Sequence, residues 1–205
     1  MHGVRALAAA VSLAHAGLLA GVFFSTSIKT HVFVSTELSG LLFFRVCNTC
    51  FVLLELLSAA YYLHAGLQGS QWLYAALSAA LAAAVGWVLL VCSPVDQAAH
   101  MGGAGVFIAG TVGYSVPLFM QAGGWLRVAL YALGGGGVVA ALVYVALYFA
   151  GLYGEAAAAE WAAFMTHAVL LLSFFSANDP EPKEEGKAKG QRGGREREWL
   201  LKPQG

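Results

Sequence analysis

Long apolar runs separated by short polar segments make up the first 177 residues of the chain. A membrane hydrocarbon core of about 30 Å is crossed by about 20 apolar residues in a helix. The pattern meets this length six times, with five or seven spans as the alternatives. We predict spans at Ala6–Thr26, Val46–Ala65, Trp72–Cys92, Met101–Gln121, Leu126–Tyr153 and Ala156–Ala177. Because the segments between them are short, we expect consecutive helices to be antiparallel and adjacent.

The second span begins earlier, near Leu38, if Arg45 is tolerated inside the bundle. The first span also has features of a signal peptide: Arg5 precedes an apolar run, and Ala14-His15-Ala16 has the small-x-small form of a cleavage site. The apolar run continues well beyond that site, which favours an uncleaved helix over a cleaved signal peptide.

The last part of the chain differs sharply from the rest. Residues 178–205 contain seven of the 11 Lys and Arg residues and six of the 11 Asp and Glu residues, together with Pro and Gly and no apolar period. This composition predicts a disordered tail. We therefore divide the chain into a transmembrane bundle, residues 1–177, and a charged cytosolic tail, residues 178–205.

Composition supports an all-α polytopic membrane protein. The chain is 59% hydrophobic and 11% charged, its mean hydropathy is +0.70 and its net charge is zero. We expect membrane lipids and a membrane-protein complex as partners, and no nucleic acid. With six spans, Arg5, Arg127 and the basic tail fall on one side and Lys29 on the other, which predicts that both termini are cytosolic.

Two ionisable residues share one face of the last span. Glu160 and His167 are seven residues apart, so their side chains project within about 20° of one another on an α-helix. Ionisable groups inside a membrane are costly and face the bundle interior or a polar cavity. We predict that this face points away from lipid, either fixing the packing of the helices or lining a conduction path.

A second polar group lies along the second span. Arg45 and Glu55 are ten residues apart, about 15 Å along a helix axis, so they cannot pair within one straight helix. Each is therefore expected to have a partner elsewhere, and an interhelical ion pair between Arg45 and Glu160 is one arrangement. With Glu160 and His167, they form the predicted polar core of the bundle.

The stretch from Cys92 to Gly103, which links the third span to the start of the fourth, contains a further loop cluster, Asp96, His100, Gly102 and Gly103. Asp96 and His100 have the i, i+4 spacing of a helical turn. A Ser/His/Asp site with Ser93 is the catalytic alternative, but the GxSxG motif of a nucleophile elbow is missing.

Cysteine and histidine patterns give little support for a metal or cofactor. Cys47 and Cys50 form a CxxC motif without a second ligand pair, whereas a structural zinc site needs about four ligands. His15 and His167 lie inside spans and leave a bis-histidine haem site as an alternative. We predict no cofactor. Small residues are interpreted as helix-packing positions: Gly17 and Gly21, Ala109 and Gly113, and the run Gly134–Gly137.

Four short stretches resemble the DRAM/FRAG/Sfk family of six-span membrane proteins. They are TELSGLLFF, DQAAHMGGAGVFIAGTVGY, WLRVALYALG and AAAAEWAAFMTHAVLLLSFF, which in order and spacing cover most of residues 36–177. The resemblance implies that Glu160, Trp161, His100, Gly102 and Gly103 are characteristic positions. The chain departs from the family in its short first loop, in Arg45 and in lacking the loop cysteines.

The resemblance implies a role in membrane-lipid handling, of the GPI-anchor, phosphoinositide or autophagy type, in an endomembrane, the lysosome or the plasma membrane. We expect a non-enzymatic regulator or scaffold. The alternatives are a small transporter or channel subunit with a path along Glu160 and His167, and a membrane-embedded lipid-modifying enzyme that uses Asp96, His100 and Ser93.

Overall fold

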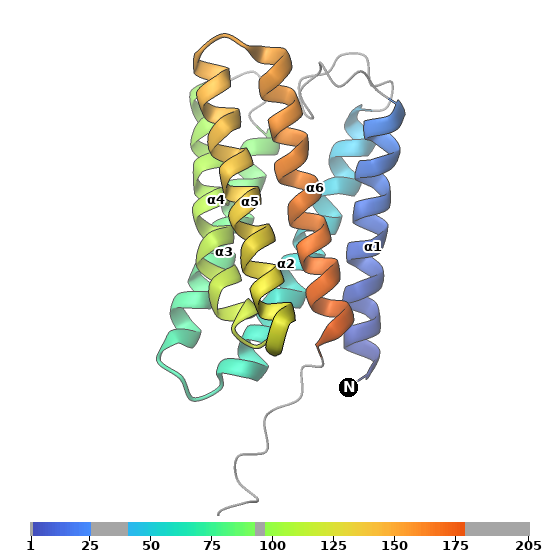
Figure 1. Ribbon diagram of the computed structural model, residues 1–205, viewed down its shortest axis with the longest axis vertical. Coiled ribbons are helices and arrows are strands. Elements are labelled where there is room, and N and C mark those ends of the chain that lie inside the picture. Colours follow the sequence, from blue (N-terminus) through green and yellow to red (C-terminus); the bar gives the residue numbers. More distant parts are fainter. Residues whose placement is uncertain (1, 26–40, 93–96, 179–205) are drawn as a thin grey trace, which may run out of the picture.

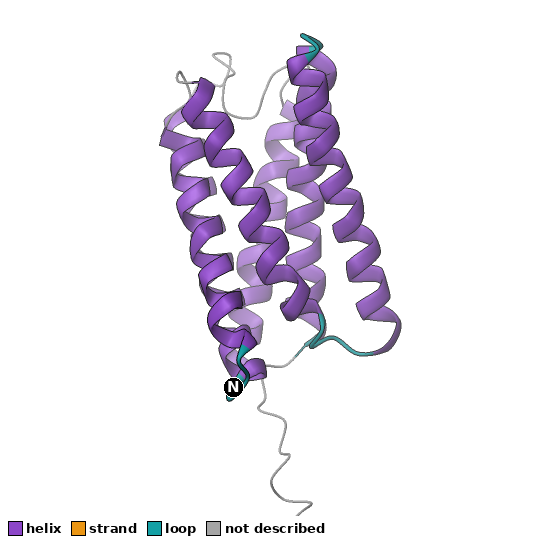
Figure 2. Ribbon diagram, turned by 90° about the vertical axis from the view of Figure 1, so that its left-hand side faces the viewer, coloured by secondary structure: helices purple, strands orange, loops and turns teal. Residues whose placement is uncertain are grey.

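Six long helices form the part of the chain that the computed structural model describes, residues 2–25, 41–92 and 97–178 (Figures 1 and 2). Each is long and apolar enough to cross a membrane. The predicted all-α, six-span architecture is confirmed. The helices are α1 (His2–Ser25), α2 (Leu41–Leu67), α3 (Trp72–Cys92), α4 (Gln97–Phe119), α5 (Gly124–Phe149) and α6 (Tyr153–Ala177).

Successive helices run antiparallel and form a closed ring. Each helix packs against the next one along the chain, and α6 returns to pack against α1 (Figure 1). Consequently α2, α4 and α6 all run from the end of the bundle where α1 finishes toward the end where it begins. Contact is most extensive between α3 and α4, and among consecutive helices it is sparsest between α4 and α5.

Glycines explain the close approach of α3 and α4. A Cβ added to Gly86 would lie 2.3 Å from the backbone nitrogen of Phe107, one added to Gly103 would lie 2.6 Å from that of Leu90, and one added to Gly110 would lie 2.4 Å from that of Ala83. Close backbone contact through small residues is a main source of helix association in membranes, where burial of apolar surface contributes little.

The glycine pairs that the sequence suggested behave differently. Gly113 does pack tightly, since an added Cβ would lie 2.8 Å from Cβ of Ala79. Gly17 and Gly21 have no atom of the described residues within 4 Å of an added Cβ, so the prediction that they form a packing face is wrong for this part of the chain. Their helix instead packs through larger side chains, among them the buried Leu19.

Aromatic side chains fill part of the interior, and large apolar side chains also cover the outer surface. Trp87, Tyr62, Tyr114, Phe174 and Phe175 are almost completely buried between the helices. Large apolar side chains also cover the outside of the bundle, among them Leu7, Leu13, Leu57, Leu81, Val128 and Leu142, each more than half exposed. Such an outer surface suits hydrocarbon rather than water, because monomeric soluble proteins rarely expose large apolar patches.

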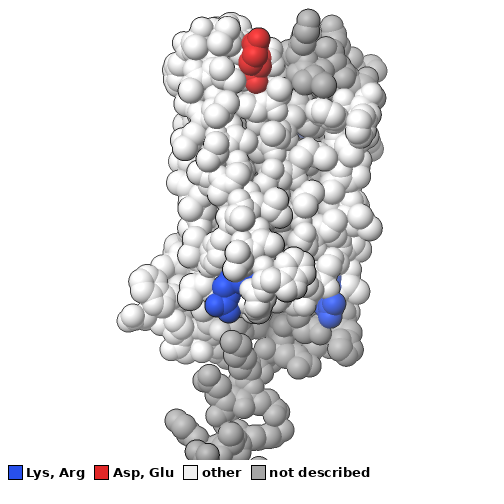
Figure 3. All heavy atoms as spheres, viewed as in Figure 1, with Lys and Arg blue, Asp and Glu red and all other residues white. Residues whose placement is uncertain are grey.

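At one end of the bundle, two arginines hydrogen bond to backbone carbonyls at or just after helix ends. Arg5 of α1 donates to the carbonyl of Ser176 near the end of α6, and Arg127 of α5 donates from Nε to the carbonyl of Ala122, 2.8 Å away, just after α4. A cation near the last carbonyls of a helix complements its dipole. Figure 3 shows basic side chains near this end and an acidic side chain at the opposite end, where the exposed Glu155 begins α6.

Helix boundaries differ from the predicted ones in two informative places. The second helix begins at Leu41, so Arg45 lies inside it, as the earlier of the two predicted boundaries allowed. The fourth begins at Gln97, so His100, Gly102 and Gly103 lie in its first two turns. The prediction that they form a loop cluster is therefore wrong. Asp96, Ser93 and the predicted tail from residue 179 onward lie outside the described residues.

Candidate functional site

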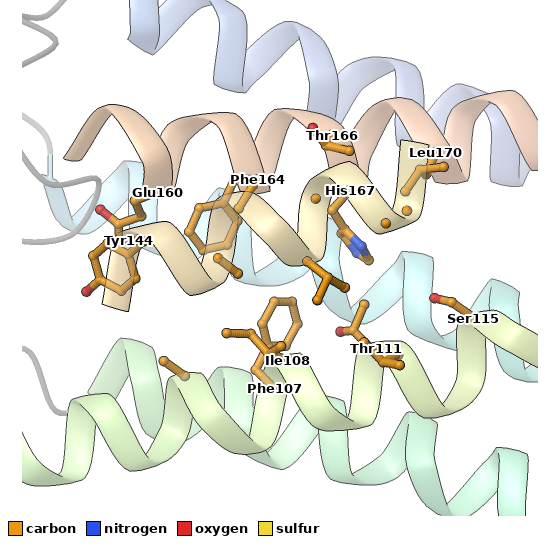
Figure 4. A pocket seen from close by; sticks show the side chains of 18 of the residues that line it. Phe107, Ile108, Thr111, Ser115, Tyr144, Glu160, Phe164, Thr166, His167 and Leu170 are labelled. Atoms are coloured by element: carbon orange, nitrogen blue, oxygen red, sulfur yellow. The ribbon is translucent and has the colours of Figure 1, made fainter. Parts of the chain in front are cut away.

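A cavity of about 290 Å³ lies inside the bundle between α4, α5 and α6 (Figure 4). Its walls are mainly aliphatic and aromatic, with Phe107 and Phe119 from α4, Leu130 from α5, and Phe164 and Leu170 from α6. A size near 300 Å³ and a mostly apolar lining are typical of sites for small ligands. This is the candidate functional site.

The cavity exists because α5 lacks side chains where it faces α4 and α6. Gly134, Gly135 and Gly137 line it. A Cβ added to Gly134 would only touch Phe119 and Leu170, at 3.8 and 3.9 Å, so space remains beyond it. The run Gly134–Gly137, interpreted from sequence as a close-packing element, thus forms a cavity wall. Within this run only Gly137 has a close neighbour, since a Cβ added to it would lie 3.1 Å from Cγ2 of Thr166.

One end of the cavity carries Glu160 and Tyr144. The two side chains lie beside each other in Figure 4, Glu160 from α6 and Tyr144 from α5. Glu160 is 5% exposed, and the hydroxyl of Tyr144 lies 3.8 Å from Sδ of Met101 on α4. The carboxylate of Glu160 is therefore buried beside the ring of Tyr144. This end of the cavity is its most polar part.

Two side chains that line the cavity, His167 and Thr111, each have a polar atom that is buried among neighbouring atoms. Nε2 of His167 and Oγ1 of Thr111 are buried and make no hydrogen bond with any described residue. Both side chains line the cavity, His167 from α6 and Thr111 from α4 (Figure 4). Buried polar groups in native proteins are nearly always hydrogen bonded, so such groups call for an explanation. Glu160 and His167, predicted to share one helix face, therefore line the same cavity.

A second polar cluster joins α1 to α2 in the interior. Nδ1 of His15 lies 2.8 Å from Oε2 of Glu55, and Nε2 of His15 lies 2.7 Å from Oδ1 of Asn48. His15, Asn48 and Glu55 are all at most 1% exposed, and the ring of His15 also stacks on Phe51 with 5.8 Å between centroids. We call these three residues the His15 cluster.

Both ring nitrogens of His15 have a partner in the His15 cluster. Nε2–H of His15 donates to the amide oxygen of Asn48, which leaves Nδ1 facing the carboxyl group of Glu55. Ionisable groups inside a membrane bundle usually pair with one another, as these two do.

Sequence reasoning found only part of this cluster. Glu55 was expected to pair with a residue on another helix, but His15 was considered only as a haem ligand. Both ring nitrogens of His15 are in fact occupied by Glu55 and Asn48. The signal that could have revealed the pair is their position, since His15 and Glu55 both lie near the middle of consecutive antiparallel spans.

Of the remaining candidate residues, His100 also lines the cavity, whereas Arg45, Gly102 and Gly103 do not. Arg45 is half-buried in the second turn of α2, and its pairing with Glu160 stays a prediction. Nδ1–H of His100 donates a hydrogen bond to the carbonyl of Leu90, 3.0 Å away, because a carbonyl oxygen can only accept. His100 thus connects the start of α4 to the last turn of α3. Gly103 is part of the tight α3–α4 contact, whereas Gly102 has no described atom nearby.

Metal ligands do not cluster in the described residues. No group of three His, Cys, Asp or Glu side chains there could hold a metal ion. Cys47, Cys50 and Cys92 are free thiols.

The fold and the apolar outer surface define a multi-pass α-helical membrane protein. Comparison with protein-family models, with curated proteins and with solved structures finds no match to the chain.

Proposed function

We propose that this protein acts in membrane-lipid handling as a non-enzymatic regulator or scaffold, and that the cavity between α4, α5 and α6 binds a lipid. The observation that carries the proposal is the cavity itself, an apolar space of about 290 Å³ lying within the membrane-spanning segments. A ligand at this depth must be compatible with hydrocarbon.

The walls of the cavity indicate access from the bilayer. Val112 and Val116 of α4 and Tyr131 of α5 line it and are also between 37% and 46% exposed on the outside of the bundle. These residues belong to the pair of consecutive helices with the sparsest contact. A lipid chain can therefore enter sideways between α4 and α5 without passing through water.

The resemblance to the DRAM/FRAG/Sfk family supports the lipid-handling role, with a membrane-protein complex as partner in an endomembrane, the lysosome or the plasma membrane. We further propose that both termini are cytosolic. Arg5 and Arg127 lie at the end of the bundle where the chain begins, and the exposed Glu155 lies at the other end. Cytosolic ends of membrane helices are enriched in Lys and Arg.

A small transporter is the second candidate, because Glu160 and His167 line one cavity. In that case the polar groups would bind a moving solute or proton rather than support a lipid site. Proton-driven solute uptake by proteoliposomes, abolished by Glu160→Gln while the protein stays folded, would favour the transporter.

The proposed lipid site is tested by filling the cavity. Gly134→Leu places a branched side chain into the cavity beside Phe119 and Leu170. Gly136→Leu adds the same side chain to the same glycine run at a position that does not line the cavity. Purified full-length protein in bilayer nanodiscs is labelled with a photoactivatable alkyl-chain lipid. We expect labelling of the cavity-facing peptides to fall at least about tenfold in Gly134→Leu, because a lost ligand contact of about 1.4 kcal/mol already gives tenfold.

The matched variant Gly136→Leu should label like the wild type, since a Cβ there has no described atom within 4 Å. Equal labelling of wild type and both variants, or labelling confined to the outer helix faces, would show that the cavity holds no lipid and would reject the proposal.

A further inference from the structure

We infer that the lipid bound in this cavity has a polar group that donates hydrogen bonds and carries no negative charge, such as a hydroxyl group or an amine. This group lies at the end of the cavity that contains His100, Tyr144 and Glu160, and the apolar chain extends toward the other end. This proposal rests on the proposed lipid-binding function and names the class of ligand.

The three polar residues lie near one end of the bundle. His100 is three residues beyond the first residue of α4, Glu160 is seven residues beyond the first residue of α6, and Tyr144 is five residues before the last residue of α5. Because α4 and α6 begin at the end where α5 finishes, the three Cα atoms lie about 5–11 Å from that end, at 1.5 Å per residue. This depth is in the outer part of the hydrocarbon core, close to the lipid head groups.

The opposite end of the cavity is mainly apolar. Phe119 is the last residue of α4, and Leu170 lies in the second half of α6, away from Glu160 (Figure 4). Nineteen residues separate His100 from Phe119, so the cavity wall extends about 28 Å along α4. Val116, which is exposed to lipid, is near Phe119, so the opening between α4 and α5 lies beside the chain of the ligand and not beside its polar group.

Other polar side chains along the cavity do not select the charge of a ligand. The hydroxyl groups of Ser115, Tyr131 and Thr166 are uncharged, and the last two already donate to backbone carbonyls, at 2.9 and 2.7 Å. Nε2 of His167 and Oγ1 of Thr111 are enclosed by neighbouring atoms and do not face the ligand. The end near His100 therefore determines which polar group the site accepts.

Hydrogen-bond acceptors predominate at that end. Nδ1–H of His100 donates to the carbonyl of Leu90, which leaves Nε2 of the neutral ring as an acceptor. His100 is only partly buried, and its Nε2 has no hydrogen-bond partner among the described residues. A carboxylate has about four lone-pair sites, so Glu160 can accept from a ligand in addition to other donors. The hydroxyl group of Tyr144 can accept as well as donate. A ligand group that donates hydrogen bonds matches this set.

The charge of the cavity excludes anionic ligands. Among the described residues that line it, Glu160 is the only carboxylate, and none is Lys or Arg. A phosphate or carboxylate group would meet a like charge without a counterion in an apolar setting, which is strongly unfavourable. A hydroxyl group avoids this repulsion, and a protonated amine is attracted to Glu160.

The test uses wild-type full-length protein in nanodiscs and three photoactivatable probes that share one alkyl chain and end in a hydroxyl group, an amine or a carboxylate. We expect the hydroxyl or amine probe to half-saturate labelling of the cavity-facing peptides at a concentration at least about tenfold below that of the carboxylate probe, a difference of about 1.4 kcal/mol. The better of the two identifies the polar group. A photoactivatable group at the tip of the chain should label the peptides that contain Phe119 or Leu170, and one beside the polar group should label the peptide that contains His100.

Two matched variants test the role of charge. Glu160→Gln keeps the size of the side chain and an acceptor oxygen but removes the charge, so discrimination against the carboxylate probe should fall from about tenfold to about threefold or less. Glu155→Gln removes the same charge from the exposed start of α6, outside the cavity, and should keep the wild-type discrimination. The comparison of probes on the wild type does not depend on the folding of either variant.

Separate results bear on the two proposals. If all three probes label the cavity equally and Gly134→Leu abolishes that labelling, the lipid site stands and this inference is wrong. Reversed positions of the two labels, or an equal loss of discrimination in Glu160→Gln and Glu155→Gln, also overturn it. If no probe labels the cavity, both proposals fail.

Discussion

Replacing Glu55 with leucine removes the carboxyl group 2.8 Å from Nδ1 of His15 without a large change in side-chain volume. The ring of His15 would keep Asn48 as its partner at Nε2, but Nδ1 would lose its hydrogen bond to Glu55. Because both residues are buried between α1 and α2, no rearrangement to water is available inside the membrane. The substitution therefore tests whether the His15 cluster holds these two helices together.

The expected magnitude follows from two contributions. Hydrogen bonds between membrane helices are worth about 0.6 kcal/mol on average and up to about 1.7 kcal/mol. Leaving a buried polar group without a partner costs a further 1–3 kcal/mol, roughly. The short distance and complete burial of the pair place it toward the upper end of the first range. We expect Glu55→Leu to lower the free energy of unfolding by about 2–4 kcal/mol.

A double-mutant cycle separates the pair from its surroundings. If His15 and Glu55 stabilise each other, the double variant should lose less unfolding free energy than the two single variants, His15→Leu and Glu55→Leu, lose together. We expect this difference, the coupling energy, to be about 1–2 kcal/mol. The free energy of unfolding is measured in bicelles by steric trapping. Glu155→Gln serves as a control, because Glu155 is exposed at the start of α6, and its change should stay below about 1 kcal/mol.

Additive effects of the two substitutions, with a coupling energy below about 0.3 kcal/mol, would refute the reasoning. They would mean that the contact seen between His15 and Glu55 does not contribute to stability, and that the position of α1 depends on apolar packing alone.

Two further predictions concern other parts of the bundle. Gly86→Ala should lower the free energy of unfolding by about 1–3 kcal/mol, because the new Cβ would lie 2.3 Å from the backbone nitrogen of Phe107. Gly105→Ala, with no described atom within 4 Å of the new Cβ, should be neutral or slightly stabilising. An equal loss of stability in both variants would show that the close contact between α3 and α4 does not determine the effect. Arg127→Met should lower the melting temperature in detergent by a few degrees, because it removes the hydrogen bond to the carbonyl of Ala122, and an unchanged melting temperature would show that this helix end needs no cation.

The sequence predicted the helices well because hydrocarbon imposes a strict length and composition on any segment that crosses it. The first residue of a helix was harder to predict where an ionisable side chain lay near the end of an apolar run. Arg45 made the start of the second span uncertain, and α2 begins four residues before it. His100 was placed in a loop, but its proton-donating Nδ1 is satisfied by the carbonyl of Leu90, so the helix can begin before it.

The candidate site could be predicted only along single helices. The seven-residue spacing of Glu160 and His167 follows from helix geometry, and both residues do line one cavity. In contrast, the contact of His15 with Glu55 depends on the relative rotation and height of two helices, which periodicity within each helix does not determine. The sequence therefore predicted that polar residues lie inside the bundle, but it did not predict which of them contact one another.

The glycine run of α5 shows most directly why the cavity was not predicted. Consecutive glycines in an apolar span allow either a close approach of backbones or an empty space beside them, and which one forms depends on the facing helix. In α3 and α4, glycines from both helices meet and the backbones touch. Opposite Gly134, α4 and α6 present Phe119 and Leu170, whose bulk keeps the helices apart. The same residue type thus closes the interface between α3 and α4 and leaves space beside α5.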